Sequence, residues 1–427
     1  MCTRISKSRR RGPTRFALVG LALSCATLTL ASRAPAQTPV RGTDHRVVWP
    51  DVLPADSYFG RTVCAARGTE YAHAGAPNGP GRAELAFDGQ QWFVDARFTS
   101  PVGSQPYACA RDGDTAGMVR ALLRSDGTYS VYAMPSGDEL IGGIDGGEVD
   151  TLAKSGPTLV VGQPDYGVGG RVTIYEDNQQ FGWLAVHTIE GTADQDLGAS
   201  LALRDHGFLF VGAPGAAPNG EVQTWVRLND GSWVPYLVLT SPAVSQSGNA
   251  NFGAAVAADG DLVAIGSPRW DRPLIGASAT DQGTVYLYRP DGLGFALEAT
   301  VRPPESQPFD YYGDSLDLEV GDSGRALLVV GAPREDVTWI NTGAAYVWSY
   351  DGTSWRPVWR LIDTSRTALD RMGEALSLTS NGGVLVGSPN WNANGVNDQG
   401  AVVFFDLALF RDGFESGNVS AWSATTP

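Results

Sequence analysis

The sequence is poor in the residues and motifs that concentrate catalytic chemistry. Its four histidines, His45, His73, His187 and His206, are scattered and form neither an H-x-x-x-H pair nor a histidine–cysteine cluster. No G-x-S-x-G motif, phosphate-binding loop or dinucleotide fingerprint occurs. The sequence does not decide whether two carboxylates form a catalytic pair, because 46 acidic residues allow many pairings. The sequence therefore predicts no catalytic residue and no cofactor.

Basic residues are also scarce. The formal net charge is −15, and Lys154 is the only lysine beyond Lys7. Seven of the 31 basic residues and none of the 46 acidic ones lie before residue 37, so the rest of the chain is more acidic still. An acidic surface repels polyphosphates. We therefore expect neither nucleic acid nor an anionic membrane as a partner.

Long apolar runs are absent apart from one, Phe16–Ala31, which is too short to make a good membrane span. It follows the basic stretch "SKSRRRGPTRF" and precedes an A-x-A site at Ala34–Ala36. A lipid anchor on Cys25 is the weaker alternative, because Ala22 is a poor match three residues before it. The pattern predicts a signal peptide over residues 1–36 and a secreted or cell-surface protein that starts at Gln37.

Cysteine is rare, and two of the four cysteines precede residue 37. Cys64 and Cys109 remain, and two cysteines in an exported protein are more often bridged than free. We expect a Cys64–Cys109 disulfide.

What the sequence has in abundance is one repeated phrase. "LLVVGAPRED" returns in near copies as "LVVGQPDYG", "LFVGAPGAA", "LVAIGSPRW" and "VLVGSPNWN". An aromatic or large apolar residue followed by glycine precedes most copies, as at Phe252-Gly253, and recurs about every 55 to 60 residues. A segment such as "GAAYVWSYDGTSW" follows each copy. A fixed period of this length indicates a ring or array of equal units.

Each unit predicts four short antiparallel strands. Alternating or apolar runs are separated by Gly, Pro, Asn and Asp. The repeated phrase marks the end of the second strand, where glycine permits close backbone approach and proline stops the ladder. Asp-Gly pairs predict the hairpin to the outermost strand, which begins with an aromatic such as Trp92, Trp233 or Trp355.

The number of units depends on residues 93–195, where two copies are degenerate. "GMVRALLRSDGTYSVYAM" (Gly117–Met134) matches a third and fourth strand, and "DGGEV" (Asp145–Val149) opens the next unit. This gives seven units, with six as the fallback. The last unit stops after its third strand, and "RVVWPDVL" near the N-terminus resembles the missing fourth. We predict an all-β propeller of seven four-stranded blades over residues 46–407, closed by the N-terminal strand.

These motifs together resemble the FG-GAP repeats of integrin α-subunit propellers and their secreted bacterial relatives. The resemblance implies a seven-bladed propeller. In the calcium-binding blades of that family, the loop between the first two strands reads D-x-D-x-D-G-x-x-D. The matching loops here, such as "AADGDLVAI", hold no three alternating acids. Asp259 and Asp261 are better explained by a hairpin turn, so we predict no metal site.

The family's ligand face is built by the loops that join strand two to three and strand four to the next blade. In this chain those loops are longest in the last three units, and each carries one tryptophan. Exposed aromatics with polar neighbours suit recognition of a protein or a glycan, unless each tryptophan folds inward over its own blade. The candidate ligand-binding residues are Trp270, Trp339, Trp391, Arg269, Asp271, Arg334, Glu335, Asp336 and Asn390.

Residues 408–427 lie outside the repeat and predict a short C-terminal tail rich in Gly, Ser and Thr. The sequence favours a secreted, monomeric, non-enzymatic propeller that binds an extracellular protein or glycan. A glycan-active hydrolase or lyase with acids in the central channel and a structural cell-surface component remain as alternatives. The ligand itself is not identified by the sequence.

Overall fold

The computed structural model divides the chain into two units, residues 1–36 and 37–427. The structure describes residues 40–41, 45–47, 57–66, 71–76, 81–88, 92–99, 106–111, 118–134, 136–205, 207–243, 248–274, 277–337, 339–363, 368–380, 382–392 and 397–407. The predicted signal peptide and the predicted tail lie outside these residues. Their assignment stays a prediction.

All regular structure in the described residues is β-strand, and the strands form seven four-stranded antiparallel blades. Blade 1 holds β3 (Thr62–Ala65), β4 (Tyr71–Ala76), β5 (Gly81–Phe87) and β6 (Trp92–Thr99); blade 2 holds β7 (Pro106–Arg111), β8 (Met118–Leu123), β9 (Tyr129–Met134) and β10 (Glu139–Ile144); blade 3 holds β11 (Thr151–Ser155), β12 (Thr158–Gln163), β13 (Arg171–Asn178) and β14 (Gly182–Glu190). Blade 4 holds β15 (Ser200–Arg204), β16 (Phe208–Ala213), β17 (Glu221–Arg227) and β18 (Trp233–Thr240); blade 5 holds β19 (Val256–Asp259), β20 (Leu262–Ser267), β23 (Thr284–Asp291) and β24 (Gly294–Val301). Blade 6 holds β25 (Leu316–Val320), β26 (Ala326–Ala332), β27 (Ala344–Tyr350) and β28 (Trp355–Leu361); blade 7 holds β29 (Leu376–Leu378), β30 (Gly383–Ser388), β31 (Ala401–Asp406) and β2 (His45–Val47).

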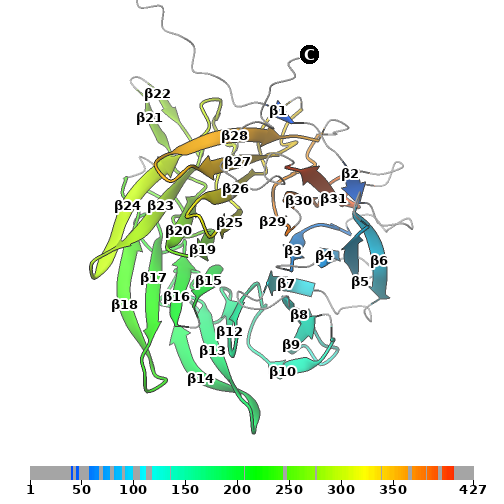
Figure 1. Cartoon of the computed structure of the whole chain (residues 1–427), viewed down its shortest axis with the longest axis vertical. Coiled ribbons are helices and arrows are strands. Elements are labelled where there is room, and N and C mark those ends of the chain that lie inside the picture. Colours follow the sequence, from blue (N-terminus) through cyan, green and yellow to red (C-terminus); the bar gives the residue numbers. More distant parts are fainter. Residues whose placement is uncertain are drawn as a thin grey trace, which may run out of the picture. The chain divides into compact units, whose positions relative to one another are not determined.

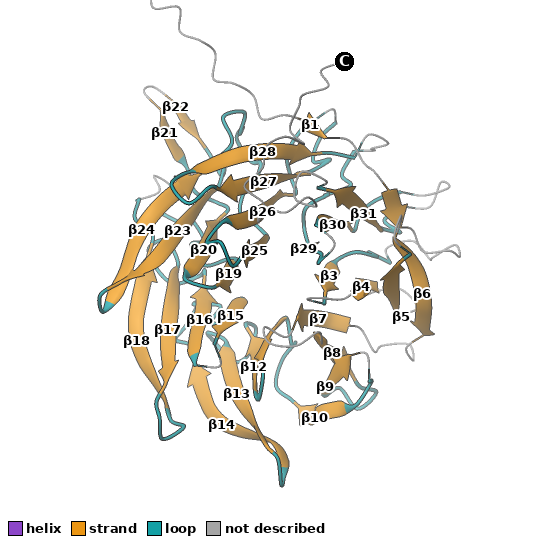
Figure 2. Cartoon of the chain, viewed as in Figure 1, coloured by secondary structure: helices purple, strands orange, loops and turns teal. Residues whose placement is uncertain are grey.

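The blades form a closed ring around a central channel (Figures 1 and 2). The first strand of each blade contacts the first strand of the next, from β3 through β7, β11, β15, β19, β25 and β29 back to β3. The N-terminal strand β2 pairs antiparallel with β31, so it supplies the fourth strand of blade 7. The predicted fold and the predicted closure are both confirmed.

Two short additions lie outside the seven four-stranded blades. Strand β1 (Val40–Arg41) pairs in parallel with the outer edge of β28, which gives blade 6 a fifth strand. The hairpin of β21 (Arg272–Leu274) and β22 (Ala277–Ala279) is inserted between the second and third strands of blade 5. Both additions fall among blades 5 and 6, where the sequence also has its longest loops.

The strand assignment within blade 2 differs from the prediction. The segment Gly117–Met134 supplies the second and third strands, β8 and β9, rather than the third and fourth. The turn at Asp126-Gly127 therefore joins inner strands, whereas Asp-Gly marks the outer hairpin in blades such as blade 6. The true fourth strand is β10, whose pairing with β9 is interrupted by register shifts. Its two glycines weaken the strand pattern, so the sequence does not reveal it.

The hydrophobic core of the described residues is divided among the gaps between blades. Seven clusters of buried residues occur, and each joins two neighbouring blades. Tyr312 and Tyr346, for example, pack edge-on between blades 5 and 6 with ring centroids 5.5 Å apart. No blade buries its apolar faces alone, so the ring must close for any blade to be stable.

The glycines of the repeated phrases position neighbouring blades. Gly373, which follows Met372, has a φ of +98° and donates its N–H to the carbonyl oxygen of Gly387 in its own blade. Its own carbonyl oxygen faces Gly331 of the preceding blade, and a Cβ on Gly331 would lie 2.0 Å from it. Gly343, which opens the third strand, approaches Met372 in the same way. The three glycine positions of the repeat thus meet at one seam between blades.

We predict that Gly331→Ala destabilises the ring, because the added methyl group forces blades 6 and 7 apart. The free energy of unfolding should fall by about 1–3 kcal/mol or more in chemical denaturation. Gly321→Ala is the matched control, since Gly321 is exposed and a Cβ there meets no atom closer than 3.7 Å. Equal stability of the two variants would contradict this account of the seam.

Among the described residues, the gap between blades 1 and 2 has the smallest apolar cluster. It consists of Cys64, Ala66, Met118 and Met134, with Cys109 packed against them and no aromatic ring. A disulfide joins Cys64 on β3 to Cys109 on β7, with their Cα atoms 6.2 Å apart. The covalent bond therefore joins blades 1 and 2 across this gap.

We predict that the disulfide contributes much of the free energy that holds blades 1 and 2 together. Replacing both cysteines with alanine, or reducing the bond, should lower the free energy of unfolding by about 2–5 kcal/mol. Thermal unfolding with and without a thiol reductant measures this. The double variant should be insensitive to the reductant, and a wild-type protein equally insensitive would refute the prediction.

Candidate functional site

Two sets of loops meet on the face where the innermost strands begin. One set joins the second and third strands of a blade, and the other enters each blade from its predecessor. In blade 6 they are joined by hydrogen bonds from Arg334 N–H to the Asp310 carbonyl and from Leu369 N–H to the Ile340 carbonyl, 3.4 and 2.9 Å long. The loop 333–343 therefore lies between the entry loops of blades 6 and 7. This is the face that the sequence predicted for ligand binding.

The structure separates the nine predicted binding residues by burial. Arg269, Arg334, Asp336 and Trp339 are exposed, Asn390 and Trp391 are half-buried, and Trp270, Asp271 and Glu335 are buried. The sequence left open whether the three tryptophans are exposed or fold inward, and in the structure Trp339 alone is exposed.

Trp270 is buried because it occupies a structural position of the repeat. Trp270, Glu335 and Trp391 each stand two residues after the proline of the repeated phrase, where a tight turn leads the chain back toward the blade. The carbonyl of each accepts the N–H of the glycine that opens the third strand, such as Gly283 for Trp270. The guanidinium of Arg302 stacks on the Trp270 ring at 4.2 Å. The number of residues after the proline of the repeated phrase therefore distinguishes Trp270, Glu335 and Trp391 from Trp339 in the sequence itself.

Trp339 belongs to an exposed group that the sequence did not bring together. Phe309, Trp339, Ile340 and Leu369 are each more than half exposed, and together they are called the apolar loop patch. Phe309 and Leu369 occupy the same position in the entry loops of blades 6 and 7, four residues before the repeat glycine. Both have positive φ, 68° and 73°, which is uncommon for bulky residues. The patch combines backbone strain with apolar exposure.

Arginines lie beside this patch at the mouth of the channel. The guanidiniums of Arg334 and Arg269 lie 4.2 and 6.0 Å from the ring of Tyr311. Desolvation and the charge of Glu374 raise the pKa of Asp314 to about 6, and Arg334, Arg371 and Arg269 oppose this rise. We call Arg269, Arg334 and Arg371 the arginine group. Arg371 pairs with Glu374 at 3.8 Å, whereas Arg269 and Arg334 form no ion pair with any described residue.

Buried acids lie beneath the loops of blade 6. Glu335 pairs through Oε1 with Arg360, while its Oε2 and both carboxylate oxygens of Glu305 are buried without a hydrogen-bond partner among the described residues. Asp310 accepts the N–H of Gln307 at 2.5 Å. Burial, reinforced by the charge of Glu335, raises the pKa of Asp310 to about 8. With one arginine among three acids, the cluster retains a proton near neutral pH.

A second acidic group was missed by the sequence reasoning. Glu148, Asp150 and Asp165 place carboxylate oxygens within 4.8 Å of one another on the entry loop and the second loop of blade 3. It is the one trio of this kind in the described ranges. Burial and the charges of Glu148 and Asp165 raise the pKa of Asp150 to about 6. The prediction of no metal site considered only the loops between first and second strands. These acids instead lie on the loop that enters blade 3 and on the loop between its second and third strands.

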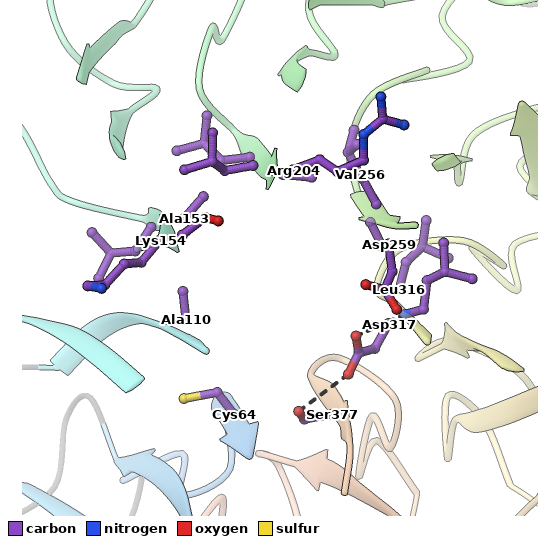
Figure 3. Close-up of a pocket in the computed structure, with 18 of the residues that line it drawn as sticks. Cys64, Ala110, Ala153, Lys154, Arg204, Val256, Asp259, Leu316, Asp317 and Ser377 are labelled. Atoms are coloured by element: carbon purple, nitrogen blue, oxygen red, sulfur yellow. Dashed lines mark hydrogen bonds between the residues drawn. The ribbon is translucent and has the colours of Figure 1, made fainter. Parts of the chain in front are cut away.

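The channel is lined mainly by the innermost strands, and one pocket within it has a volume of about 300 Å³ (Figure 3). The carboxylate of Asp259 accepts the N–H of Val320 in the next blade, and that of Asp317 accepts the N–H of Leu378, both at 2.7 Å. Lys154 and Arg204 turn away from the middle of the channel in Figure 3. Asp259 and Asp317 thus connect blades.

Comparisons with known proteins identify the fold. No family model matches the chain, and no curated protein matches it. A WD40-type propeller chain from "Crystal Structure of Mitotic Checkpoint Complex" is similar, with a TM-score of 0.52 over 95% of this chain and 98% of that one. The two sequences are 14% identical, so the likeness concerns the fold. Over the described residues, no helix has the length and hydropathy of a membrane span.

We predict that Asp310 makes stability fall with rising pH. Its pKa is higher in the folded protein, about 8, than its ordinary value of 3.8. Below pH 3.8 the Asp310 carboxyl is protonated in both the folded and the unfolded protein. As the pH rises from 3.8 toward 8, the free energy of unfolding falls by up to about 1.4 kcal/mol per pH unit, because only the folded protein keeps this proton. Asp310→Asn should therefore flatten the pH dependence of the free energy of unfolding between pH 5 and 9. Asp322→Asn, in an exposed turn, should leave it unchanged.

Proposed function

We propose that this protein is a secreted, non-enzymatic binding propeller of the FG-GAP type. It recognises an extracellular protein or glycan through the loops of blades 5 to 7. The apolar loop patch is the observation that carries the proposal. Four large apolar side chains are exposed on loops that hydrogen bonds hold side by side. Such contiguous exposure on a soluble protein marks an interaction surface.

Backbone geometry supports a binding role for this patch. Asp194 occupies the position of Phe309 and Leu369 in the entry loop of blade 4, also with positive φ. Aspartate tolerates this conformation better than a bulky apolar residue does. A phenylalanine and a leucine at this position are strained and also exposed. Contact with a ligand would offset both costs.

The channel offers less support for the enzymatic alternative. A hydrolase or lyase of the expected type needs free carboxylates, one to donate a proton and one to accept it. The carboxylates of Asp259 and Asp317 are engaged with the backbone of the next blade. These two acids therefore favour a structural role, whereas Asp150 and Asp205 also line the channel. The likeness to a propeller from a multiprotein complex is compatible with binding but does not name a ligand.

Export of the protein remains part of the proposal. The leader over residues 1–36 would direct secretion, with the mature protein starting at Gln37 as a monomer. The Cys64–Cys109 disulfide is in keeping with an oxidising compartment. The tail over residues 408–427 is proposed as a surface-attachment or solvated segment.

A binding screen on glycan and extracellular-protein arrays tests the proposal. We expect a specific hit that Trp339→Ala combined with Ile340→Ser weakens at least tenfold, because anchors of this size dominate interfaces. Leu293→Ser is the control, since Leu293 is 87% exposed at a turn between third and fourth strands. It should bind like wild type.

The screen also separates the alternatives. A hit that survives excess EDTA fits a metal-free face, and one lost with EDTA would assign a role to Glu148, Asp150 and Asp165. Turnover of a glycan that the patch variant leaves intact would overturn the proposal in favour of the enzyme. Absence of binding on both arrays would favour the third alternative, a structural cell-surface component.

A further inference from the structure

The mouth of the channel is electrically divided. The positions that surround it are equivalent from blade to blade, but their side chains differ. Asp194 and Asp196 occupy the entry loop of blade 4, and Asp165 stands on blade 3. In blades 5 to 7 the position of Asp196 carries Asn251, Tyr311 and Arg371, and the position of Asp165 carries Arg269, Arg334 and Asn390. In a chain of net charge −15, the arginine group places three positive charges among acids of the same loops, which include Asp281, Asp314 and Glu374.

Two members of the arginine group, Arg269 and Arg334, are held in place and exposed to a partner. Arg334 and Arg269 are exposed, and both are oriented by the ring of Tyr311. Tyr311 donates its hydroxyl to Asp281 at 3.3 Å, so the ring has its own support. An arginine fixed over an aromatic ring keeps its N–H donors free for a carboxylate. Neither arginine has an ion-pair partner within the described part of the chain.

The arginines and the apolar loop patch are parts of one surface. Phe309 stands two residues before Tyr311, and Leu369 stands two residues before Arg371. Arg334 belongs to the loop that also carries Trp339 and Ile340. Two residues of extended chain span at most about 7 Å. A short peptide can therefore contact the patch and the arginines at once.

We propose that blades 5 to 7 bind a polypeptide segment in which an acidic residue stands within about three residues of a large apolar one. This inference rests on the proposed function and specifies its partner. The carboxylate of the segment meets Arg334 and Arg269, and its apolar side chain covers Trp339, Ile340 and Leu369. The aliphatic side chains of the patch suit hydrocarbon better than sugar. The acids of blades 3 and 4 repel the segment and confine it to one side of the mouth.

A displayed library of random twelve-residue peptides, selected on the purified exported protein, tests the inference. We expect enrichment of peptides with Asp or Glu near Phe, Trp, Leu or Ile. A selected peptide should bind at least about tenfold more weakly to Arg334→Glu, since charge reversal makes an attractive pair repulsive. Arg356→Glu is the matched control, because Arg356 is 71% exposed on the outer strand β28. It should bind like wild type.

Selection on the double variant Arg269→Glu, Arg334→Glu gives the decisive comparison. The inference predicts that its selected peptides exchange acidic for basic residues and keep their apolar ones. Thermal unfolding of the variant close to that of wild type shows that the ring is intact. An acidic preference that persists in the double variant would overturn the inference.

The failure of this inference can be told from the failure of the proposed function. Enrichment of neutral or basic peptides on the wild type, lost in the Trp339→Ala, Ile340→Ser variant, would keep the binding face and overturn its acidic partner. No enrichment above that of the patch variant would overturn both. Weakening of the selected peptide's binding by added salt supports the charge contact, and indifference to salt overturns it.

Discussion

The contact between two glycines in neighbouring blades is the constraint on which this structure depends. The glycine that ends the second strand of one blade lies against the carbonyl oxygen of the glycine that enters the next, as Gly331 does against Gly373. No side chain fits there, because even a Cβ would overlap the carbonyl. The contact recurs at Gly212, Gly266 and Gly387 with Cβ-to-oxygen distances of 2.1, 2.0 and 1.9 Å. It fixes the spacing of adjacent blades and therefore the geometry of the ring.

A fixed seam leaves the loops beside it free to vary. The entry loops of blades 4, 6 and 7 share the same positive-φ positions, yet they present Asp194, Phe309 and Leu369. The frame determines where each side chain stands, and the residue determines its chemistry. This is how one repeat presents aspartate at this position in blade 4 and large apolar residues in blades 6 and 7. Function in this fold lies in such differences between equivalent positions.

The places where sequence reasoning failed have local physical causes. The fourth strand of blade 2 was missed because its glycines and its irregular pairing hide the alternation of a strand. Trp270 was grouped with Trp339 because both follow a repeated phrase, although only Trp270 stands at the turn position two residues after the proline. Glu305 and Asp310 lie on the entry loop of blade 6 and Glu335 lies on the loop after its second strand, so only folding brings the three acids together around Arg360. Burial of charge is a property of that assembly.

The sequence by itself determined the propeller, its seven units and the closing strand. Each of these depends on contacts that repeat with the chain, and repeated contacts leave a repeated pattern of glycine, proline and apolar residues. Only the tertiary structure decided which loop residues are exposed and which charges meet. The apolar loop patch and the arginine group join residues of different blades, so no interval in the sequence records them. Their proximity arises from the packing of neighbouring blades, which brings together residues such as Ile340 and Leu369 that are 29 positions apart along the chain (369 − 340).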